Sequence, residues 1–304
     1  MNYTVRPFRR ADRDQLTGLV NRHVEVVMPG GSVPVNTVLS QLEREPGEFI
    51  VDPWVAERVT LVAEQADNIV AAALLHRYLA DPHVPETYRG AGEIRWLLFA
   101  PIAPHGNPHW HDGNDAGNGL MQACLKQLNE WSCTTIHAGN SLPAPGVYGV
   151  PDQWRHIAVL YRRSGFEPTR LEVVHLVTVE TVTSGKASLS GLTLRRSVGI
   201  NGTRFTASRD DNELGFIEVE RLTGTDRHSG PVVADIGNLS IAETHQRQGI
   251  GTSLLRHAAE WLRFGRVDTL LAYSSPNDPS YDFLRRNGFV ALTTTKCGWT
   301  KRHP

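Results

Sequence analysis

The sequence has too few cysteines to build a cross-linked framework. Three occur in 304 residues, Cys124, Cys133 and Cys297, and their odd number and spacing fit neither a set of disulfides nor a zinc site. We expect reduced, buried thiols. The chain also lacks an apolar run long enough to cross a membrane, and residues 1–6 predict a strand rather than a secretory leader. These absences predict a cytoplasmic protein without a membrane partner.

There is also no excess of charge of either sign. The 31 lysine and arginine residues oppose 32 aspartate and glutamate residues, which gives a formal net charge of −1. Proteins that bind nucleic acid need a strong positive field, so we expect no nucleic-acid partner. The apolar content of 40 % and the length are those of a globular protein with more than one domain.

The most informative motif is a glycine loop, Gln246-Arg247-Gln248-Gly249-Ile250-Gly251. The run before it, Asp235 to Ile241, is strand-like, and the run after it, Thr252 to Phe264, has leucine and alanine at helical spacing. Two glycines let the backbone turn tightly, so that N–H groups and the positive end of the helix dipole converge on one anion. By itself, such a loop is as compatible with an ordinary turn as with a diphosphate site.

A second motif follows in order, in which Asn277 ends a strand-like run and a helical run closes on Gly288-Phe289. Together the two motifs resemble those of the GCN5-related N-acetyltransferase (GNAT) superfamily. The resemblance implies acetyl-CoA as co-substrate and no metal. The cofactor-binding residues it implies are Leu239, Ser240, Ile241, Gln246, Arg247, Gln248, Gly249, Ile250, Gly251, Thr252 and Asn277.

The first half of the chain repeats these features. Glu93 to Phe99 aligns with Asp235 to Ile241, Asn114 to Gly119 parallels the glycine loop, and Tyr161 to Phe166 parallels Leu284 to Phe289. We therefore expect two tandem GNAT-like units.

The fold class that the resemblance implies is α/β, with a mixed α+β arrangement in each unit. Each unit would hold a central, mostly antiparallel sheet flanked by helices. The expected boundaries are 1–182 and 192–304, joined by the small, polar linker 183–191.

The second unit is shorter than the first. Its first strand, Leu192 to Arg196, leads into a hairpin through only residues 197–202, which leaves no room for the two helices that precede the hairpin in the first unit. In the family these helices form much of the acceptor pocket. The second unit should therefore be open on its acceptor side, where the first unit or a second copy in a homodimer would complete it.

Acetyl transfer needs a neutral amine, donors to the developing oxyanion and a proton for the leaving thiolate. The resemblance implies Asp235 as general base through a water, although a solvent carboxylate is the alternative. Leu284 stands where the family commonly has a proton-donating tyrosine. Tyr281, one turn earlier, is a candidate donor, with a packing role as the alternative. Tyr161 occupies the family position in the first unit.

The first unit departs from the family pattern at its cofactor side. Asn114 stands where Gln or Arg is usual, Trp154 stands where the pantetheine-side Asn would be, and residues 102–113 are inserted before the glycines. We expect the cofactor in the second unit. The insertion holds His109-Trp110-His111, which could line the acceptor pocket; two histidines one residue apart do not complete a metal ligand set.

The favoured function is direct transfer of an acetyl group from acetyl-CoA to the primary amine of a small molecule. A neutral chain with long uncharged insertions suits a compact metabolite better than a polyanion. The alternatives are transfer to a protein or peptide amine and a non-catalytic acyl-CoA sensor or scaffold. Leu284 is the feature that supports a sensor.

Overall fold

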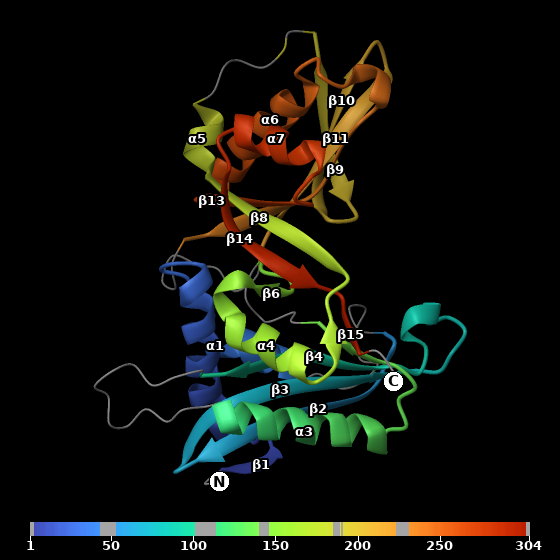
Figure 1. Cartoon of the computed structure of the whole chain (residues 1–304). Helices are drawn as coiled ribbons and strands as arrows, with labels where there is room; N and C mark the ends of the chain where they lie inside the picture. Colours follow the sequence, from blue (N-terminus) through green and yellow to red (C-terminus); the bar gives the residue numbers. More distant parts are fainter. Residues whose placement is uncertain are drawn as a thin grey trace. The chain divides into compact units, whose positions relative to one another are not determined.

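The computed structural model describes residues 3–42, 53–100, 114–139, 146–184, 189, 191–222 and 231–301. The chain forms two compact units. Unit 1 comprises Met1–Leu171 with Thr295–Pro304, and unit 2 comprises Glu172–Thr294. Each contains a β-sheet with helices packed on it (Figure 1), which confirms the predicted mixed α/β class.

Unit 1 is built on a seven-stranded sheet of order β1-β2-β3-β4-β5-β15-β7, antiparallel except between β4 and β5. Two helices separate β1 from β2, as the sequence predicts. The strands are β1 Thr4–Pro7, β2 Val55–Gln65, β3 Asn68–Tyr78, β4 Gly92–Phe99, β5 Ile136–Ala138, β7 Phe166–Glu167 and β15 Trp299–Lys301. The helices are α1 Arg13–Val27, α2 Val35–Leu42, α3 Asn114–Glu130 and α4 Arg155–Arg163.

Unit 2 has the strand order β14-β8-β13-β12-β11-β10-β9. The end of β14, Thr295 and Lys296, belongs to unit 1 and pairs there with β6, Val150–Pro151. The strands are β8 Arg170–Thr178, β9 Thr193–Gly199, β10 Gly202–Arg209, β11 Asn212–Arg221, β12 Val233–Ile241, β13 Thr269–Ser274 and β14 Val290–Cys297. The helices are α5 Val179–Thr183, α6 Ile250–Phe264 and α7 Pro279–Arg286.

The hairpins of the two units have the same turn. Ala66 and Asp67 join β2 to β3 with φ of 46° and 61°, and Asp210 and Asp211 join β10 to β11 with φ of 49° and 64°. Positive φ at both central residues defines the turn that matches the twist of a hairpin. In unit 2 only two residues separate β9 from β10, which confirms that the two helices are missing there.

A β-bulge fixes how the repeats correspond. In β4 the pairing with β3 skips Arg95, and in β12 the pairing with β11 skips Gly237. The bulges lie at the same place in the aligned runs, so the predicted match of Glu93–Phe99 to Asp235–Ile241 is confirmed. A Cβ at Gly237 would lie 2.5 Å from the Cβ of Asn201, so the bulge needs a glycine there.

The predicted parallel between Asn114–Gly119 and the glycine loop is wrong, because these residues form the first turns of α3. The buried faces of α3 and α6 superimpose when Leu120, Cys124 and Leu128 are set against Leu254, Ala258 and Leu262. In that register, Gly117 corresponds to Gly251 and Asp115 to Gly249. Asp115 in the first turn complements the helix dipole, and this helix begins before its glycines.

The compact units do not follow the predicted boundaries, since the halves of the sequence exchange strands. β8 precedes the predicted linker, yet it lies between β13 and β14 of unit 2, and β15 follows unit 2 in the chain, yet it lies between β5 and β7 of unit 1. The apolar core of unit 2 includes Val177, Val179 and Val182, all of them before the predicted linker. Alternation along a strand specifies its faces but not its neighbours.

The exchange predicts how fragments behave. Residues 172–294 should give a cooperative thermal transition by circular dichroism, whereas residues 192–304 should not, because they lack β8 and the valines that it and α5 bring to the core. Equal cooperativity in the two fragments would contradict the strand assignment.

Candidate functional site

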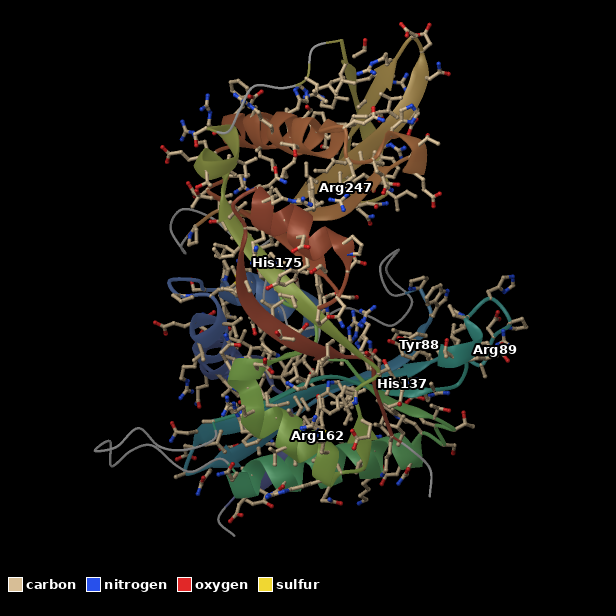
Figure 2. The ribbon with its side chains drawn as sticks, turned by 45° about the horizontal axis from the view of Figure 1, so that its top comes forward. Tyr88, Arg89, His137, Arg162, His175 and Arg247 are labelled. Carbon is tan, nitrogen blue, oxygen red and sulfur yellow. The ribbon has the colours of Figure 1, made fainter. Side chains whose placement is uncertain are left out.

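The glycine loop presents backbone N–H groups at the start of α6. Arg247 and Gly249 have φ of 63° and 83°, and the loop from Gln246 to Gly249 is exposed, with Arg247 at its surface (Figure 2). The first helical bond is donated by Ser253 N to Gly249 O at 3.0 Å. The N–H groups of residues 250–252 therefore have no acceptor within the helix, which suits them to hold an anion at the positive helix end.

Side chains hold the loop in this shape. The Gln246 amide donates to the carbonyl of Ile241 at 3.1 Å, and the Gln248 amide donates to the carbonyl of Thr244 at 3.2 Å. Leu189 packs beside the loop, 3.3 Å from where a Cβ of Gly249 would lie. The two glutamine side chains therefore bond the loop itself, and the backbone N–H groups of residues 250–252 remain to bind a ligand.

The strands next to the loop part from each other. β12 and β13 pair in parallel from Val233 to Asp235, the last pair being Asp235 with Leu271. Beyond that point β12 runs on to Ile241 and, among the described residues, pairs only with β11. Gly237, Asn238 and Ser240 are exposed. One backbone edge of residues 239–241 therefore has no described strand beside it, and of its groups the Ile241 carbonyl already accepts the Gln246 amide.

Asp235 lies at the point where the strands part. Its side chain is buried, with 7 % exposure, and Oδ2 accepts a hydrogen bond from the hydroxyl of Tyr273 at 3.3 Å. Burial raises the pKa of Asp235 to about 6; the Glu220 carboxylate adds to the increase and the Tyr273 hydrogen bond opposes it. A carboxylate of this pKa is ionised at neutral pH and remains basic enough to accept a proton.

Tyr281 packs against a histidine that the sequence did not reveal as part of this unit. The rings of Tyr281 and His175 have centroids 5.0 Å apart at 71°. His175 Nε2 lies 2.8 Å from Ser274 Oγ, and both residues are buried. Burial lowers the pKa of His175, so the imidazole is neutral at neutral pH. His175 stands on β8 (Figure 2), a strand predicted to belong to the other unit.

Asn277 and Leu284 lie on either side of Tyr281 in the sequence. Asn277 is exposed just after β13 and precedes Asp278, which caps α7 by accepting a hydrogen bond from Ser280 N at 2.7 Å. Leu284 is only 4 % exposed and packs in the apolar core of unit 2, so it adds packing where a tyrosine would supply a proton.

Unlike the glycine loop, which belongs to unit 2, Tyr161 belongs to unit 1. It is fully buried between Phe166 and Trp299, with ring centroids 5.7 and 5.3 Å away. Among the residues that the structure describes, its hydroxyl has no hydrogen-bond partner, and burial raises its pKa. The structure therefore places this predicted proton donor in the core of unit 1.

Unit 1 has the same parting of strands, but protein atoms fill it. β4 and β5 pair up to Ile94, and the residues that follow, Trp96 to Phe99, are at most 3 % exposed. The Trp154 indole N–H donates to the carbonyl of His23 at 3.1 Å, His23 Nε2 lies 3.2 Å from the carbonyl oxygen of Phe99, and the ring of His156 packs on that of Phe99. We call His23, Trp154 and His156 the unit 1 plug.

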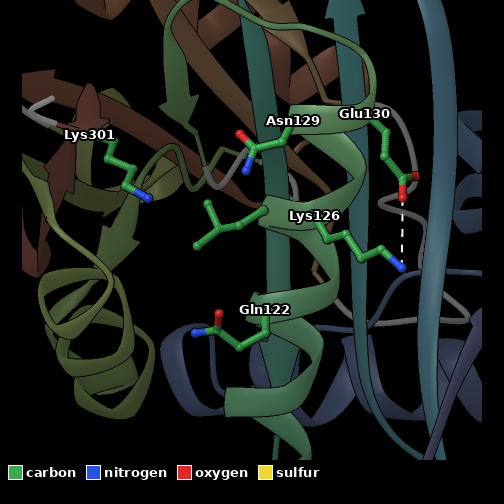
Figure 3. Close-up of a pocket in the computed structure, with 6 residues that line it drawn as sticks. Gln122, Lys126, Asn129, Glu130 and Lys301 are labelled. Atoms are coloured by element: carbon green, nitrogen blue, oxygen red, sulfur yellow. Dashed lines mark ion pairs between the residues drawn. The ribbon is translucent and has the colours of Figure 1, made fainter.

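A surface groove of about 610 Å³ lies elsewhere in unit 1 (Figure 3). Lys126 and Glu130 on α3 form an ion pair of 3.7 Å along one side, and Lys301 of β15 lies on the other. None of the predicted site residues lines this groove, and Gln122, Leu125 and Asn129 complete it.

Within the part of the chain that the structure describes, no three His, Cys, Asp or Glu side chains are grouped to hold a metal ion. His109-Trp110-His111 lie outside those residues. No described helix is both long and apolar enough to span a membrane.

The comparison with known families bears on unit 2. Residues 192–289 match the acetyltransferase (GNAT) family. The chain carries a GNAT domain. The match includes the glycine loop, Asp235 and Asn277. No curated protein matches the sequence.

Solved structures extend the GNAT likeness to the whole chain. A tandem GNAT protein from the clavulanic acid biosynthesis pathway is 16 % identical, with a TM-score of 0.68 and 98 % of each chain covered. A GCN5-related N-acetyltransferase from Sphaerobacter thermophilus is 14 % identical, with a TM-score of 0.62, 99 % of this chain and 95 % of that one covered.

A third structure is the GCN5-related glucosamine N-acetyltransferase region of a fungal multi-domain β-N-acetylglucosaminidase. It is 15 % identical, with a TM-score of 0.64, and 98 % of this chain covers 38 % of that one. At these identities the likeness shows the fold, which is that of two tandem GNAT units. The GNAT match at residues 192–289 and the shared fold support an acyl-CoA-dependent N-acetyltransferase in general.

The unit 1 plug predicts a large stability effect. Trp154→Ala should lower the free energy of unfolding by about 3–5 kcal/mol, because it empties a core site and removes the bond to His23. Trp54→Ala, at a 40 % exposed position, should change it by no more than about 0.5 kcal/mol. Urea denaturation measures both, and similar losses in the two variants would contradict a packed plug.

Proposed function

We propose that the chain transfers an acetyl group from acetyl-CoA directly to the primary amine of a small molecule, with the cofactor in unit 2. The observation that carries the proposal is the contrast between the units. β12 is open beyond its bulge and has free N–H groups beside it at α6, whereas the corresponding part of β4 is buried under the unit 1 plug.

The residues of unit 2 fit an acyl-CoA. The N–H groups of Ile250, Gly251 and Thr252 would hold the diphosphate, which the helix dipole stabilises. The free backbone edge from Leu239 to Ile241 would bond the amides of the pantetheine arm, and Asn277 would reach the arm from the end of β13. Acetyl-CoA supplies a thioester that is activated toward attack by an amine.

Asp235 would act as the general base. An amine must lose a proton as it attacks, and a carboxylate with a pKa of about 6 accepts that proton through a water near neutral pH. Backbone N–H groups at the bulge, where β12 is exposed, would donate to the developing oxyanion. Such fixed donors are often the largest contribution to acyl transfer.

A small-molecule acceptor is supported by two observations. The net charge of −1 provides no field for a polyanionic partner. Similar folds include a protein of the clavulanic acid pathway and a glucosamine N-acetyltransferase region, both named for small molecules.

Buried Leu284 favours a second candidate function, an acyl-CoA sensor that does not turn over. The two functions separate in a screen of thiol release against a library of small amines and peptides. Release with a small amine supports the proposal, and release with peptides alone would redirect it to protein amines. Tight acetyl-CoA binding without release by any amine would establish the sensor.

The cofactor assignment predicts a difference between two matched variants. Gly249→Trp places an indole over the free N–H groups and should abolish acetyl-CoA binding in calorimetry. Asp115→Trp changes the corresponding exposed residue of unit 1 and should leave the affinity unchanged. Loss of binding only in Asp115→Trp would place the cofactor in unit 1.

The base assignment predicts the pH profile of kcat/KM. Activity should rise with pH through about 6, because only ionised Asp235 accepts a proton. Asp235→Asn should lower the rate by about 10²-fold and remove the rise of kcat/KM with pH. Glu220→Gln is the matched control, because it removes a neighbouring charge that raises the pKa of Asp235. In that variant the rise should occur at lower pH and reach a similar maximal rate. If the rise near pH 6 persists in Asp235→Asn, another group is responsible for it.

A further inference from the structure

The acetyl-transfer reaction leaves a thiolate that needs a proton, and unit 2 has no tyrosine at the usual place. Leu284 occupies that position with 4 % exposure. The described part of unit 2 nevertheless holds a buried hydroxyl–imidazole pair next to the strand that parts from β12. The pair is Ser274 with His175, at 2.8 Å between Oγ and Nε2.

The pair lies on the side of the sheet where the cofactor loop and α7 are. Ser274 is the last residue of β13, three positions beyond Leu271, the last residue of that strand paired with β12. His175 stands on the neighbouring strand opposite Ala272. The ring of Tyr281, from α7, packs on the imidazole. Ser274 therefore lies where β13 is no longer paired with β12, and its partner His175 lies on β8, on the other side of β13 from β12.

The strand exchange explains why the pair exists. Val177, two residues from His175 on β8, packs in the core of unit 2 with Leu254 of α6. Alternation along β8 then turns His175 to the same side of the sheet. The inserted strand thus supplies an imidazole to a unit that lacks the usual proton donor.

We propose that Ser274 protonates the leaving thiolate and that His175 resupplies the proton. The inference rests on the proposed function. The Ser274 O–H bond breaks as an S–H bond forms, and Ser274 Oγ takes the Nε2 proton of His175. His175 Nδ1 takes a proton from water, and the hydroxide left behind is neutralised by the proton that Asp235 passes from the amine to solvent. No net proton is gained or lost.

His175 suits this relay in its chemistry. Burial lowers its pKa, so it is neutral, with one ring nitrogen carrying a proton and the other able to accept one. Ser274 is the residue that meets the sulfur, and His175 acts through Ser274. Tyr281, a candidate donor from the sequence with a packing role as its alternative, contributes its ring by holding the imidazole in place.

Steady-state thiol release tests the assignment in the full-length protein. Ser274→Ala and His175→Gln should each lower kcat by about 10²-fold with little change in acetyl-CoA affinity. Ser274→Thr, which keeps a hydroxyl, and Tyr281→Phe, which keeps the ring, should retain most activity. If His175→Gln, which preserves a hydrogen-bonding side chain, is fully active, the pair is only an anchor for β8. If Tyr281→Phe alone is inactive, Tyr281 is the donor.

A second measurement needs no amine. Bound CoA, followed through the ultraviolet absorbance of its thiolate, should titrate below free CoA in the wild type, because the Ser274 hydroxyl donates to the sulfur. Ser274→Ala should raise the pKa of the bound thiol by roughly one unit. An unchanged thiol pKa in Ser274→Ala would overturn the relay while leaving the proposed function intact. Failure of the wild type to bind CoA would refute both.

Discussion

The candidate site depends on one interruption of backbone pairing. After Asp235 and Leu271 the parallel strands β12 and β13 part, and a free backbone edge and a buried carboxylate result at the same place. The glycine loop and α6 follow directly from the end of β12, so an anion site is set in line with that edge. Unit 1 has the same interruption after Ile94. There Trp154 and His23 occupy it, and the same architecture becomes a packed core.

Features that depend on local sequence could be predicted. The turn pairs Ala66-Asp67 and Asp210-Asp211, each containing aspartate, indicate hairpins, and Gly249 can adopt the positive φ that ends the loop. The short connection before β10 excluded two helices by length alone. These signals lie within a few residues of the structure they determine, so the strand, loop and helix around Gly249 followed from the sequence.

Features that depend on which distant segments meet could not be predicted in the same way. Arg170–Thr178 is rich in valine and leucine, as many strands are, and nothing in it says that its neighbours are β13 and β14. The pairing of His175 with Ser274 follows from that neighbourhood and spans 99 residues. The start of α3 differs from the prediction for another reason. Gly117 and Gly119 suggest a loop, but Gly117 lies inside the helix, where the absence of a side chain lets the helix pack closely against Phe99.

The position of β15 also bears on how the chain folds during synthesis. The ribosome makes β8 before the other strands of unit 2 and β15 after all of them. The sheet of unit 1 stays open between β5 and β7 until unit 2 has emerged. Unit 1 therefore cannot complete its sheet before unit 2 is made, unlike domains that fold first because they are synthesised first. Open strand edges invite pairing with other chains, and the nascent protein carries them until β15 is made.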